Sequence, residues 1–355
     1  MGCRKLKKIR IGDRLIGEGE PTFIVAEIGV NHNGSIKMAK KLIDAAKEVG
    51  ADAVKFQAFK AERIVTKYAE KAAYQKDTTD AQKSQYNMLK KLELSDAEMK
   101  ELHGYARKRN IMFLSSVFDK ESVDLLDRLD VAAFKVASGE ITDLPLLRYM
   151  ARKKRSIILS TGLSTLEEIG EALGIFTAEG ITDIVLLHCI TSYPAKAEEA
   201  NLKMMDGLKK KFGFPVGFSD HTLGTAIPIA AVALGAVMIE KHFTLDKKLQ
   251  GPDHRASLEP NEFEQMVQGI KNVESALGTG VRKLTAEEED IKKAARRSIV
   301  AKVLIRKGAV IREDMLDFKR PGTGLEPKYT HKVIGKKANK DIEADELITL
   351  EKLMW

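Results

Sequence analysis

The stretch SIILSTGLSTLEEIGEALGIFTAEGITDIVLLHC, residues 156–189, decides the fold. It begins with a short apolar run, SIILST (156–161), continues with helical spacing, and ends with a second apolar run, DIVLLHC (183–189). Ser164, followed three residues later by Glu167, predicts a capping box at the start of the helix. The stretch therefore predicts a strand, a helix and a second strand parallel to the first.

The same unit recurs along the first 280 residues. Six further apolar runs alternate with helical segments: FIVAEIG (23–29), DAVKFQ (52–57), IMFLSS (111–116), AAFKVAS (132–138), FPVGFSDH (214–221) and AVMIEKH (236–242). With the two runs above they make eight, and eight strands alternating with eight helices predict an α/β fold of the (β/α)8 TIM barrel type. An open doubly wound sheet is the alternative. No G-x-G-x-x-G follows the first run, and the count of eight favours closure.

Segments outside this repeat complete the predicted organisation. Residues 9–19 predict a small hairpin that caps the bottom of the barrel. Residues 60–92 are polar, rich in lysine and too long for an ordinary loop, so we expect them to fold over the barrel mouth. We assign residues 1–285 to the cap and barrel, 286–296 to a linker helix and 297–355 to a separate, small β-rich domain.

Composition narrows the class of protein. Hydrophobic residues make up 44% and charged residues 31% of the 355 residues, which excludes a disordered or low-complexity chain. The net charge is +8, but the basic residues are spread along the chain without an arginine-rich block. We therefore expect no nucleic-acid partner, and an anionic small substrate explains the charge equally well.

Two further features bear on location. The basic residues 1–10 have no apolar segment behind them, so no secretory signal is expected, and the apolar residues 226–239 are too short to span a membrane. We interpret residues 226–239 as a buried helix leading into a strand. Cys3 and Cys189 are the two cysteines, which excludes a disulfide framework and a cysteine-based zinc site. A reducing cytoplasmic location is expected.

Two lysines lie inside apolar strands, near the strand ends where barrel active sites form. Burying Lys55 in AVKFQ and Lys135 in AFKVAS costs free energy unless negative charge meets them. Internal salt bridges to Glu27 or Glu240 are one explanation. Three serines end strands at the same rim: Ser138, Ser160 and Ser219. Together the lysines and serines favour a site for a phosphate or carboxylate group.

Two histidines end consecutive strands at the mouth. A single histidine at such a position is more often a hydrogen-bonded structural residue, but His221 and His242 lie on neighbouring strands with carboxylates nearby. A pair of imidazoles without a thiolate leaves coordination positions open, which suits Mn, Co, Fe or Zn in a reactive site rather than a closed structural zinc. The residues alone thus predict a metal-assisted reaction on an anionic substrate.

Eight motifs together resemble those of the sialic acid synthases, which condense phosphoenolpyruvate with an N-acetylated sugar. In chain order they are AEIGVNHNG (26–34), KFQ (55–57), FKVASGE (134–140), LSTG (159–162), FSDHT (218–222), EKHFT (240–244), GPDHRASLEP (251–260) and KRPGTGL (319–325). The resemblance covers nearly the whole chain, and residues 297–355 resemble the antifreeze-like (SAF) domain of these enzymes.

The resemblance implies a role for each matching residue. Phosphoenolpyruvate would be bound by Lys55, Lys135, Ser138, Ser160 and Ser219. His221 and His242 would bind the metal, with Mn²⁺ expected first and Co²⁺ or Mg²⁺ as alternatives. The sugar would be held by Glu27, Tyr193, Asp253 and Arg320. Catalytic roles are implied for Glu27, for Gln57 beside the reacting centre and for Glu140 as an acid or base. Arg320 would act from the partner subunit, because these enzymes are domain-swapped homodimers.

The resemblance leaves the substrate open. It implies an N-acetylneuraminate synthase acting on N-acetylmannosamine, with N,N'-diacetyllegionaminate synthase or another nonulosonic acid synthase as the alternative. EIGVNHNG (27–34) and GPDHRASLEP (251–260) resemble the neuraminate and legionaminate branches more than the pseudaminate branch. Two other hypotheses are a synthase for a phosphorylated sugar and an inactive barrel with a binding SAF domain. The complete set of rim residues disfavours the inactive barrel.

Overall fold

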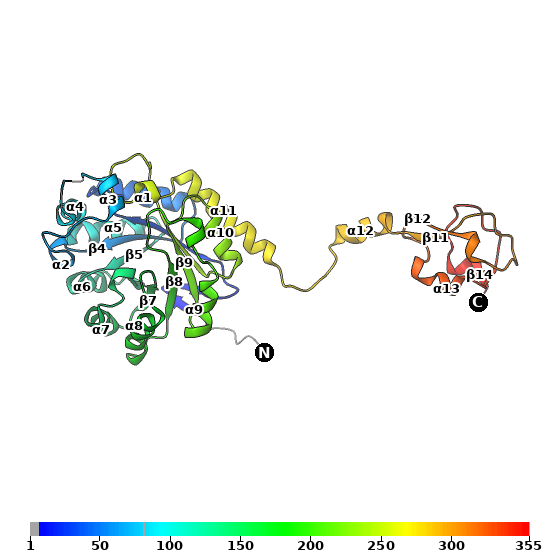
Figure 1. The fold of residues 1–355 in the computed structure, drawn as a ribbon, viewed down its shortest axis with the longest axis horizontal. Coiled ribbons are helices and arrows are strands. Elements are labelled where there is room, and N and C mark those ends of the chain that lie inside the picture. Colours follow the sequence, from blue (N-terminus) through cyan, green and yellow to red (C-terminus); the bar gives the residue numbers. More distant parts are fainter. Residues whose placement is uncertain (1–6, 81, 355) are drawn as a thin grey trace. The chain divides into compact units, whose positions relative to one another are not determined.

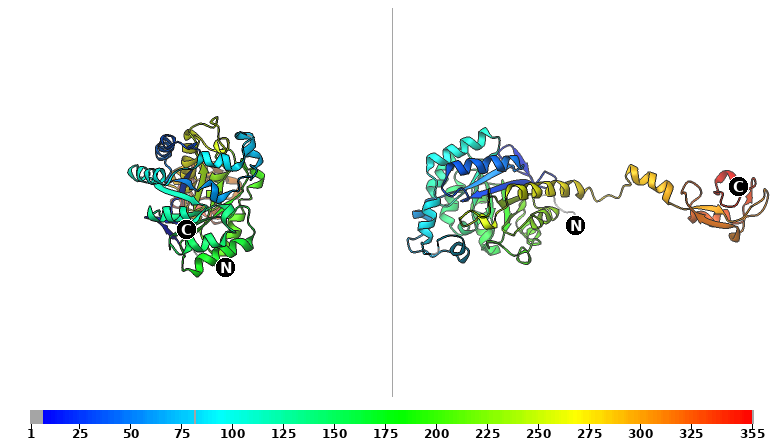
Figure 2. Two further views of the ribbon diagram at one scale, coloured as in Figure 1. Left: turned by 90° about the vertical axis from the view of Figure 1, so that its left-hand side faces the viewer. Right: turned by 90° about the horizontal axis from the view of Figure 1, so that it is seen from above.

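A computed structural model describes residues 7–80 and 82–354 of the chain. Eight parallel strands close into a barrel that helices surround (Figures 1 and 2). In barrel order the strands are β3 (Phe23–Gly29), β4 (Ala53–Ala58), β5 (Met112–Val117), β6 (Ala133–Val136), β7 (Ser156–Ser160), β8 (Ile184–Cys189), β9 (Val216–Asp220) and β10 (Met238–His242), which pairs again with β3. The predicted TIM barrel is confirmed, and each strand lies at its predicted apolar run.

One main helix follows each strand and buries an apolar face against the outside of the barrel. These helices are α1 (Ile36–Glu48), α5 (Asp96–Lys108), α6 (Lys120–Arg128), α7 (Leu144–Ala151), α8 (Leu166–Ala178), α9 (Met204–Phe212), α10 (Ala226–Ala233) and α11 (Pro260–Leu277). The apolar stretch 226–239 forms α10 and the start of β10, as predicted. No helix within residues 7–80 and 82–354 is long and apolar enough to cross a membrane.

Helix α8 corrects one sequence prediction. The capping box is formed by Thr165 and Glu168, one residue later than the predicted pair Ser164 and Glu167. Thr165 accepts a hydrogen bond from the backbone N–H of Glu168, whereas the Ser164 hydroxyl donates to the carbonyl of Gly162. Ser164 therefore belongs to the turn that precedes the helix, and the next residue is the cap.

A hairpin of β1 (Ile9–Ile11) and β2 (Arg14–Ile16) closes the lower end of the barrel. Its isoleucines are fully buried against inward-facing strand residues such as Val25 and Leu114. Apolar contact of this kind removes the barrel floor from water. The predicted cap is confirmed for residues 9–16, while residues 1–6 of the assigned barrel domain lie outside the described part.

The segment between β4 and α5 covers part of the opposite end. It forms three short helices, α2 (Ala61–Ile64), α3 (Ala73–Thr78) and α4 (Gln85–Leu92). Met88 and Leu92 of α4 pack against Val30, which follows β3. The ring of Tyr74 in α3 stacks on Tyr193, which follows β8, with 5.1 Å between the ring centroids. The predicted position over the mouth is confirmed.

The C-terminal part forms a second compact unit, Thr279–Trp355, after the barrel unit Met1–Gly278. It contains α12 (Ala286–Ala295), α13 (Thr330–Val333) and the strands β11 (Ser298–Ala301), β12 (Leu316–Lys319), β13 (Lys337–Ala338) and β14 (Leu353–Met354). Buried isoleucines, among them Ile299 and Ile348, form its own core.

The compact barrel unit ends at Gly278, and the predicted boundary after residue 285 falls at the other end of the segment that leads to α12. The predicted linker helix coincides with α12, but it belongs to the second unit. The backbone N–H of Gly322 donates to the Lys293 carbonyl at 2.7 Å, which ties α12 to that unit.

Short 3-10 turns complete the chain: Ser138–Glu140, Ala197–Glu199, His254–Ala256, Glu313–Met315, Pro327–Tyr329 and Leu350–Lys352.

Candidate active site

Four charged side chains from four strands meet inside the upper part of the barrel. Lys55 Nζ lies 2.7 Å from Glu27 Oε2 and 3.7 Å from Glu240 Oε1, and Lys135 Nζ lies 3.4 Å from the same Glu240 oxygen. All four residues are at most 5% exposed. The parallel register places Glu27 beside Lys55 on neighbouring strands. The internal salt bridges to Glu27 and Glu240, which the sequence offered as one explanation of the buried lysines, are present. Each buried lysine is therefore compensated by a carboxylate.

Serine hydroxyls complete this cluster, which we call the lysine–glutamate cluster (Glu27, Lys55, Lys135 and Glu240). Lys55 donates to Ser116 Oγ at 3.0 Å, and Lys135 donates to Ser160 Oγ at 2.7 Å. Ser219 Oγ donates to Glu240 Oε1 at 3.0 Å. Of the predicted serines, Ser160 and Ser219 therefore contact the cluster.

The third predicted serine lies at the edge of this arrangement. Ser138 accepts a hydrogen bond from the backbone N–H of Gly162 at 3.1 Å. A Cβ atom on Gly162 would lie 2.7 Å from Ser138 Oγ and 2.3 Å from Thr191 Oγ1. Glycine is therefore required for the close approach of this backbone to the two hydroxyls.

Burial and neighbouring charges set the protonation of the cluster. Burial raises the pKa of Glu27 to about 7, although Lys55 opposes the change. Burial would also raise the pKa of Glu240, but Lys135 and Lys55 outweigh it and hold that pKa below its ordinary value. Gln57 is half-buried and donates to Glu27 Oε1 at 3.3 Å. Glu240 is thus the permanent anion, and Glu27 can gain or lose a proton near neutral pH.

The two predicted histidines lie together beside this cluster. The ring centroids of His221 and His242 are 5.4 Å apart, and each residue is 5% exposed. His221 Nδ1 lies 2.7 Å from the Ile190 carbonyl, so we assign the proton to Nδ1, which leaves Nε2 as a lone-pair donor.

His242 is the second imidazole of the pair. Its Nδ1 atom is buried without a hydrogen-bond partner and lies 3.9 Å from Asp253 Oδ2. Burial and then His221 hold the pKa of His242 well below its ordinary value, so the ring is neutral.

Burial would lower the pKa of His221, but Cys189, the Ile190 carbonyl and Asp220 outweigh it and raise that pKa, so a metal at this pair would have to displace a proton from His221. In their neutral forms, two imidazoles fit a divalent metal. Among the described residues, no group of three or more His, Cys, Asp or Glu side chains is arranged to hold one. Water or substrate would therefore supply the other ligands.

Tyr193 and Asp253, both predicted to bind the sugar, border the histidine pair. The Tyr193 ring lies 4.1 Å from that of His221, centroid to centroid. Asp253 is 6% exposed, and burial raises its pKa to about 6. The Asp253 carbonyl accepts a hydrogen bond from Ser257, whose hydroxyl in turn accepts one from Asn31 Nδ2 at 2.8 Å. The loop that carries Asp253 is thereby fixed to the chain that follows β3.

Glu140 and Arg320 are the two remaining predicted site residues. Glu140 is half-buried in the 3-10 turn after β6, and burial, with Asp143 nearby, raises its pKa to about 7. Within residues 7–80 and 82–354, no ion pair or hydrogen bond links the Glu140 side chain to the lysine–glutamate cluster. Arg320 is exposed and belongs to the second unit.

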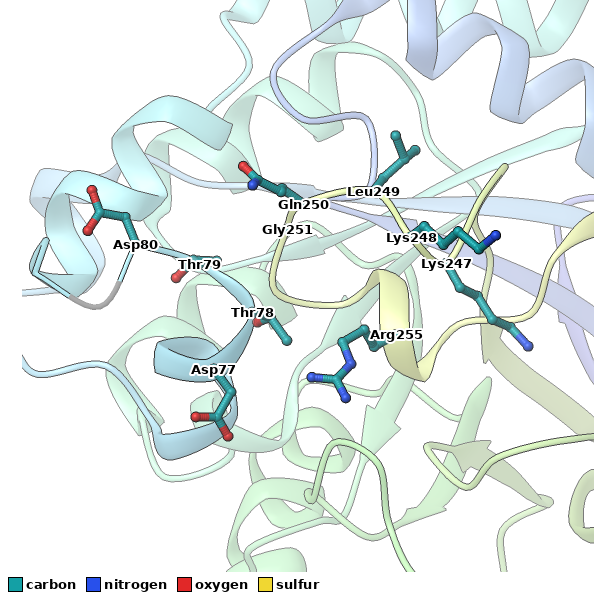
Figure 3. A pocket seen from close by; sticks show the side chains of 10 residues that line it. All are labelled: Asp77, Thr78, Thr79, Asp80, Lys247, Lys248, Leu249, Gln250, Gly251 and Arg255. Atoms are coloured by element: carbon teal, nitrogen blue, oxygen red, sulfur yellow. The ribbon is translucent and has the colours of Figure 1, made fainter.

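A pocket of about 610 Å³ opens beside the mouth (Figure 3). One wall is the end of α3 and the other is the loop after β10; they consist of Asp77, Thr78, Thr79, Asp80, Lys247, Lys248, Leu249, Gln250, Gly251 and Arg255. The Arg255 guanidinium points into the pocket toward Asp77 and Thr78. Each wall also contributes a residue near the histidine pair: α3 carries Tyr74, and the loop carries Asp253.

Sequence reasoning identified one further contributor in part and missed two. Glu240 is the carboxylate that both lysines share, but the sequence placed it only as one of two salt-bridge candidates. Ser116 belongs to the serine-rich end of β5, and its contact with Lys55 follows from strand packing rather than from any local motif. Tyr74 lies in the irregular segment over the mouth, where no periodicity predicts which side chain points inward.

Comparison with known proteins identifies the family of the chain. The NeuB family model matches residues 42–282, and the SAF domain model matches residues 296–354. The chain belongs to the NeuB family. The match to the NeuB family includes the strands β4 to β10, and thus both lysines and both histidines.

Similar proteins of known name extend the match to most of the chain. An N,N'-diacetyllegionaminic acid synthase of Campylobacter jejuni is 49% identical, over 92% of this chain and 98% of that protein. One of Legionella pneumophila is 45% identical, over 92% of this chain and 93% of that protein. An N-acetylneuraminic acid (sialic acid) synthetase of Leptospira borgpetersenii has been solved as a crystal structure. Its sequence is 35% identical to this one, and the two structures match with a TM-score of 0.70 over 81% of this chain and 95% of that chain.

Proposed function

We propose that this NeuB-family chain is a phosphoenolpyruvate-dependent nonulosonic acid synthase. It would be a transferase that joins phosphoenolpyruvate to an N-acetylated amino sugar and releases phosphate by C–O cleavage. The observation that carries the proposal is the buried lysine–glutamate cluster directly beside the paired imidazoles of His221 and His242. This arrangement provides for an anion and for a polarised carbonyl side by side.

The relatives bear on which sugar is used. The two N,N'-diacetyllegionaminic acid synthases are 49% and 45% identical to this chain, whereas the sialic acid synthetase structure is 35% identical. The resemblance of the sequence motifs makes N-acetylmannosamine the first candidate for the sugar substrate. The identities favour the alternative, so we propose the diacetylated dideoxy sugar that leads to legionaminic acid as the substrate, with N-acetylmannosamine as the second candidate.

Phosphoenolpyruvate would bind at the lysine–glutamate cluster. With Glu27 ionised, the cluster is neutral, because two lysines face two carboxylates. The ammonium groups of Lys55 and Lys135 would hold the phosphate and carboxylate groups, and the Ser160, Ser219 and Ser138 hydroxyls would complete the site.

His221 and His242 would hold a divalent metal, with Mn²⁺ first and Co²⁺ or Mg²⁺ as alternatives. The unpartnered Nδ1 of His242, and Nε2 of His221 once it has lost its proton, fit such an ion. When bound, it supplies Lewis acidity toward the sugar aldehyde. Asp253, Tyr193 and Glu27 would orient the sugar hydroxyls so that C3 of phosphoenolpyruvate faces the aldehyde carbon.

Proton transfer follows the formation of the carbon–carbon bond. Positive charge develops at C2 of phosphoenolpyruvate, water adds there, and the tetrahedral intermediate expels phosphate. Glu27 belongs to the cluster, and its pKa is about 7. We therefore assign Glu27 as the base that accepts the proton from water, with Glu140 as the second candidate. Gln57 would hold Glu27 in place, and Lys55 and Lys135 would stabilise the departing phosphate.

We also propose that the chain acts as a domain-swapped homodimer, in which Arg320 reaches the N-acetyl group bound to the partner. One experiment tests the central proposal: the protein is incubated with phosphoenolpyruvate, Mn²⁺ and each candidate sugar, and phosphate release and product mass are measured. Phosphate release with a nonulosonic acid product supports the proposal and identifies the sugar. No phosphate release with any N-acetylated sugar would contradict it, and turnover of a phosphorylated sugar instead would replace it.

A further inference from the structure

A fully buried ion pair lies next to both predicted metal ligands in the sequence. Lys241 Nζ is 2.5 Å from Asp220 Oδ2, and both side chains are 0% exposed. Asp220 immediately precedes His221, and Lys241 immediately precedes His242. The proposed function gives neither residue a role.

The register explains why this pair and the histidines lie on opposite faces. Lys241 and Asp220 are direct partners in the parallel pairing of β10 with β9. Side chains alternate along a strand, so a residue next to an inward-facing histidine points out of the barrel. Lys241 accordingly interacts with the charges of Lys247 and Glu262, and Glu262 belongs to the outer helix α11. The ion pair joins the two strands behind the imidazoles.

Thr222 ties the other side of His221 to the same pair. Its backbone N–H donates to Asp220 Oδ1 at 2.9 Å, and its hydroxyl donates to Asp220 Oδ2 at 3.2 Å. Its carbonyl accepts a hydrogen bond from Lys241 Nζ. Asp220 and Thr222, which flank His221, are therefore both hydrogen-bonded to Lys241, the residue before His242.

Strand stability alone does not explain a pair of this kind. A buried ion pair can often be replaced by apolar side chains of similar volume without loss of stability, because desolvation offsets the attraction between the charges. Apolar packing has no directional bonds, however, and would not fix the turn at residues 220–222 relative to β10. The contacts thus specify orientation.

We propose that Asp220 and Lys241 are positioning residues that set the separation and orientation of His221 and His242 for a divalent metal. The inference rests on the metal assignment in the proposed function. Groups that orient metal ligands typically change metal affinity by about 10- to 100-fold when they are removed. We expect a loss of that size although neither side chain contacts the metal.

The test uses the double variant Asp220→Asn/Lys241→Met, which removes both charges and leaves no unpaired buried ion. Mn²⁺ binding is measured by titration calorimetry, and the geometry of bound Co²⁺ by its visible absorption spectrum. We expect Mn²⁺ affinity to fall about 10- to 100-fold and the Co²⁺ spectrum to change. Phosphoenolpyruvate binding without metal should remain, because the lysine–glutamate cluster is intact.

Lys40→Met/Glu101→Gln is the matched control. This pair is also 2.5 Å apart but joins α1 to α5, away from β9 and β10, so both metal readouts should stay as in the unmodified protein. Asp220→Leu/Lys241→Met, an apolar replacement, is the second test variant if the first does not fold. Unchanged Mn²⁺ affinity with an unchanged Co²⁺ spectrum in a folded test variant would overturn the positioning role alone. If the unmodified protein binds neither metal, the metal assignment and the positioning role both fail.

Discussion

Lys135 Nζ lies 3.4 Å from Glu240 Oε1 inside the barrel and also donates a hydrogen bond to Ser160. Lys55 lies 3.7 Å from the same Glu240 oxygen, so Glu240 keeps a cationic partner if Lys135 is replaced. Lys135→Met should therefore fold. It should bind phosphoenolpyruvate at least tenfold more weakly, a change of about 1.4 kcal/mol or more, because one of two desolvated cations is lost. Titration calorimetry checks the affinity, and thermal unfolding checks the fold.

Lys153→Met serves as the control for this substitution. Lys153 pairs with Asp124 at 2.6 Å, but both side chains are partly exposed and lie outside the lysine–glutamate cluster. We expect unchanged phosphoenolpyruvate affinity in this control. The same result in Lys135→Met would remove Lys135 from the anion site.

Metal removal should abolish turnover. We expect no phosphate release after treatment with EDTA and recovery on addition of Mn²⁺ or Co²⁺, because two imidazoles alone do not polarise an aldehyde. His242→Asn should abolish Mn²⁺ binding. His188→Asn is the matched control, because His188 is equally buried on β8 but its Nε2 is held by the Ala200 carbonyl. Full turnover after verified metal removal would refute the metal site.

The half-buried carboxyl group of Glu140 predicts a dependence of stability on pH. Burial raises its pKa from 4.5 to about 7, so between these values the folded chain holds a proton that the unfolded chain has released. Stability from this group is therefore present below about pH 4.5 and is lost as the pH rises through about 7. Glu140→Gln cannot ionise, so its unfolding free energy should rise relative to that of the unmodified protein from pH 5 to pH 8.

Urea unfolding at several pH values measures this difference. The exposed Glu167→Gln is the control, and its difference from the unmodified protein should stay flat across the same range. A flat difference for Glu140→Gln as well would show that its carboxyl group titrates normally. A loss of phosphate release in Glu140→Gln, with the fold intact, would favour Glu140 over Glu27 as the proton-transferring group.

Much of the barrel could be predicted because its strands are buried on both faces. Such strands are continuous apolar runs, and a lysine or histidine within them stands out. This is why Lys55, Lys135, His221 and His242 were found from the sequence. Their partners were harder to predict. Glu240 on β10 reaches Lys135 on β6 across the barrel, and the sequence does not encode the distance between these strands. Ser116 lies on β5, next to the strand of Lys55, and no local motif predicts which of the serines at its end makes the contact.

Local ambiguity explains the remaining errors. Ser164 and Thr165 are both good helix caps, and each is followed three residues later by a glutamate, so the sequence fits two registers of α8 equally well. The hydrogen bond between Gly322 and Lys293 joins α12 to the chain that follows β12, and no local sequence pattern predicts this contact.

Arg320 gives the last prediction, which tests architecture and function together. Arg320→Ala and Lys135→Met should each be impaired, the first in holding the N-acetyl group and the second in binding phosphoenolpyruvate. In a domain-swapped dimer, each site combines one chain's barrel with the other chain's Arg320. A heterodimer of the two variants then contains one site with an intact barrel and an intact Arg320, so mixing should restore part of the activity. Phosphate release by the mixture measures it.

The alternative arrangement predicts the opposite result. If the SAF domain served the barrel of its own chain, each site in the heterodimer would carry one defect and mixing would restore nothing. Subunit exchange must be confirmed by pull-down with a tag on one variant, and mixing Arg320→Ala with tagged Arg320→Ala controls for the effect of exchange itself. Recovered activity in the mixed pair alone requires Arg320 to act in trans. Exchange without recovery, with both variants impaired, would refute the swapped dimer while leaving the chemistry of the barrel untouched.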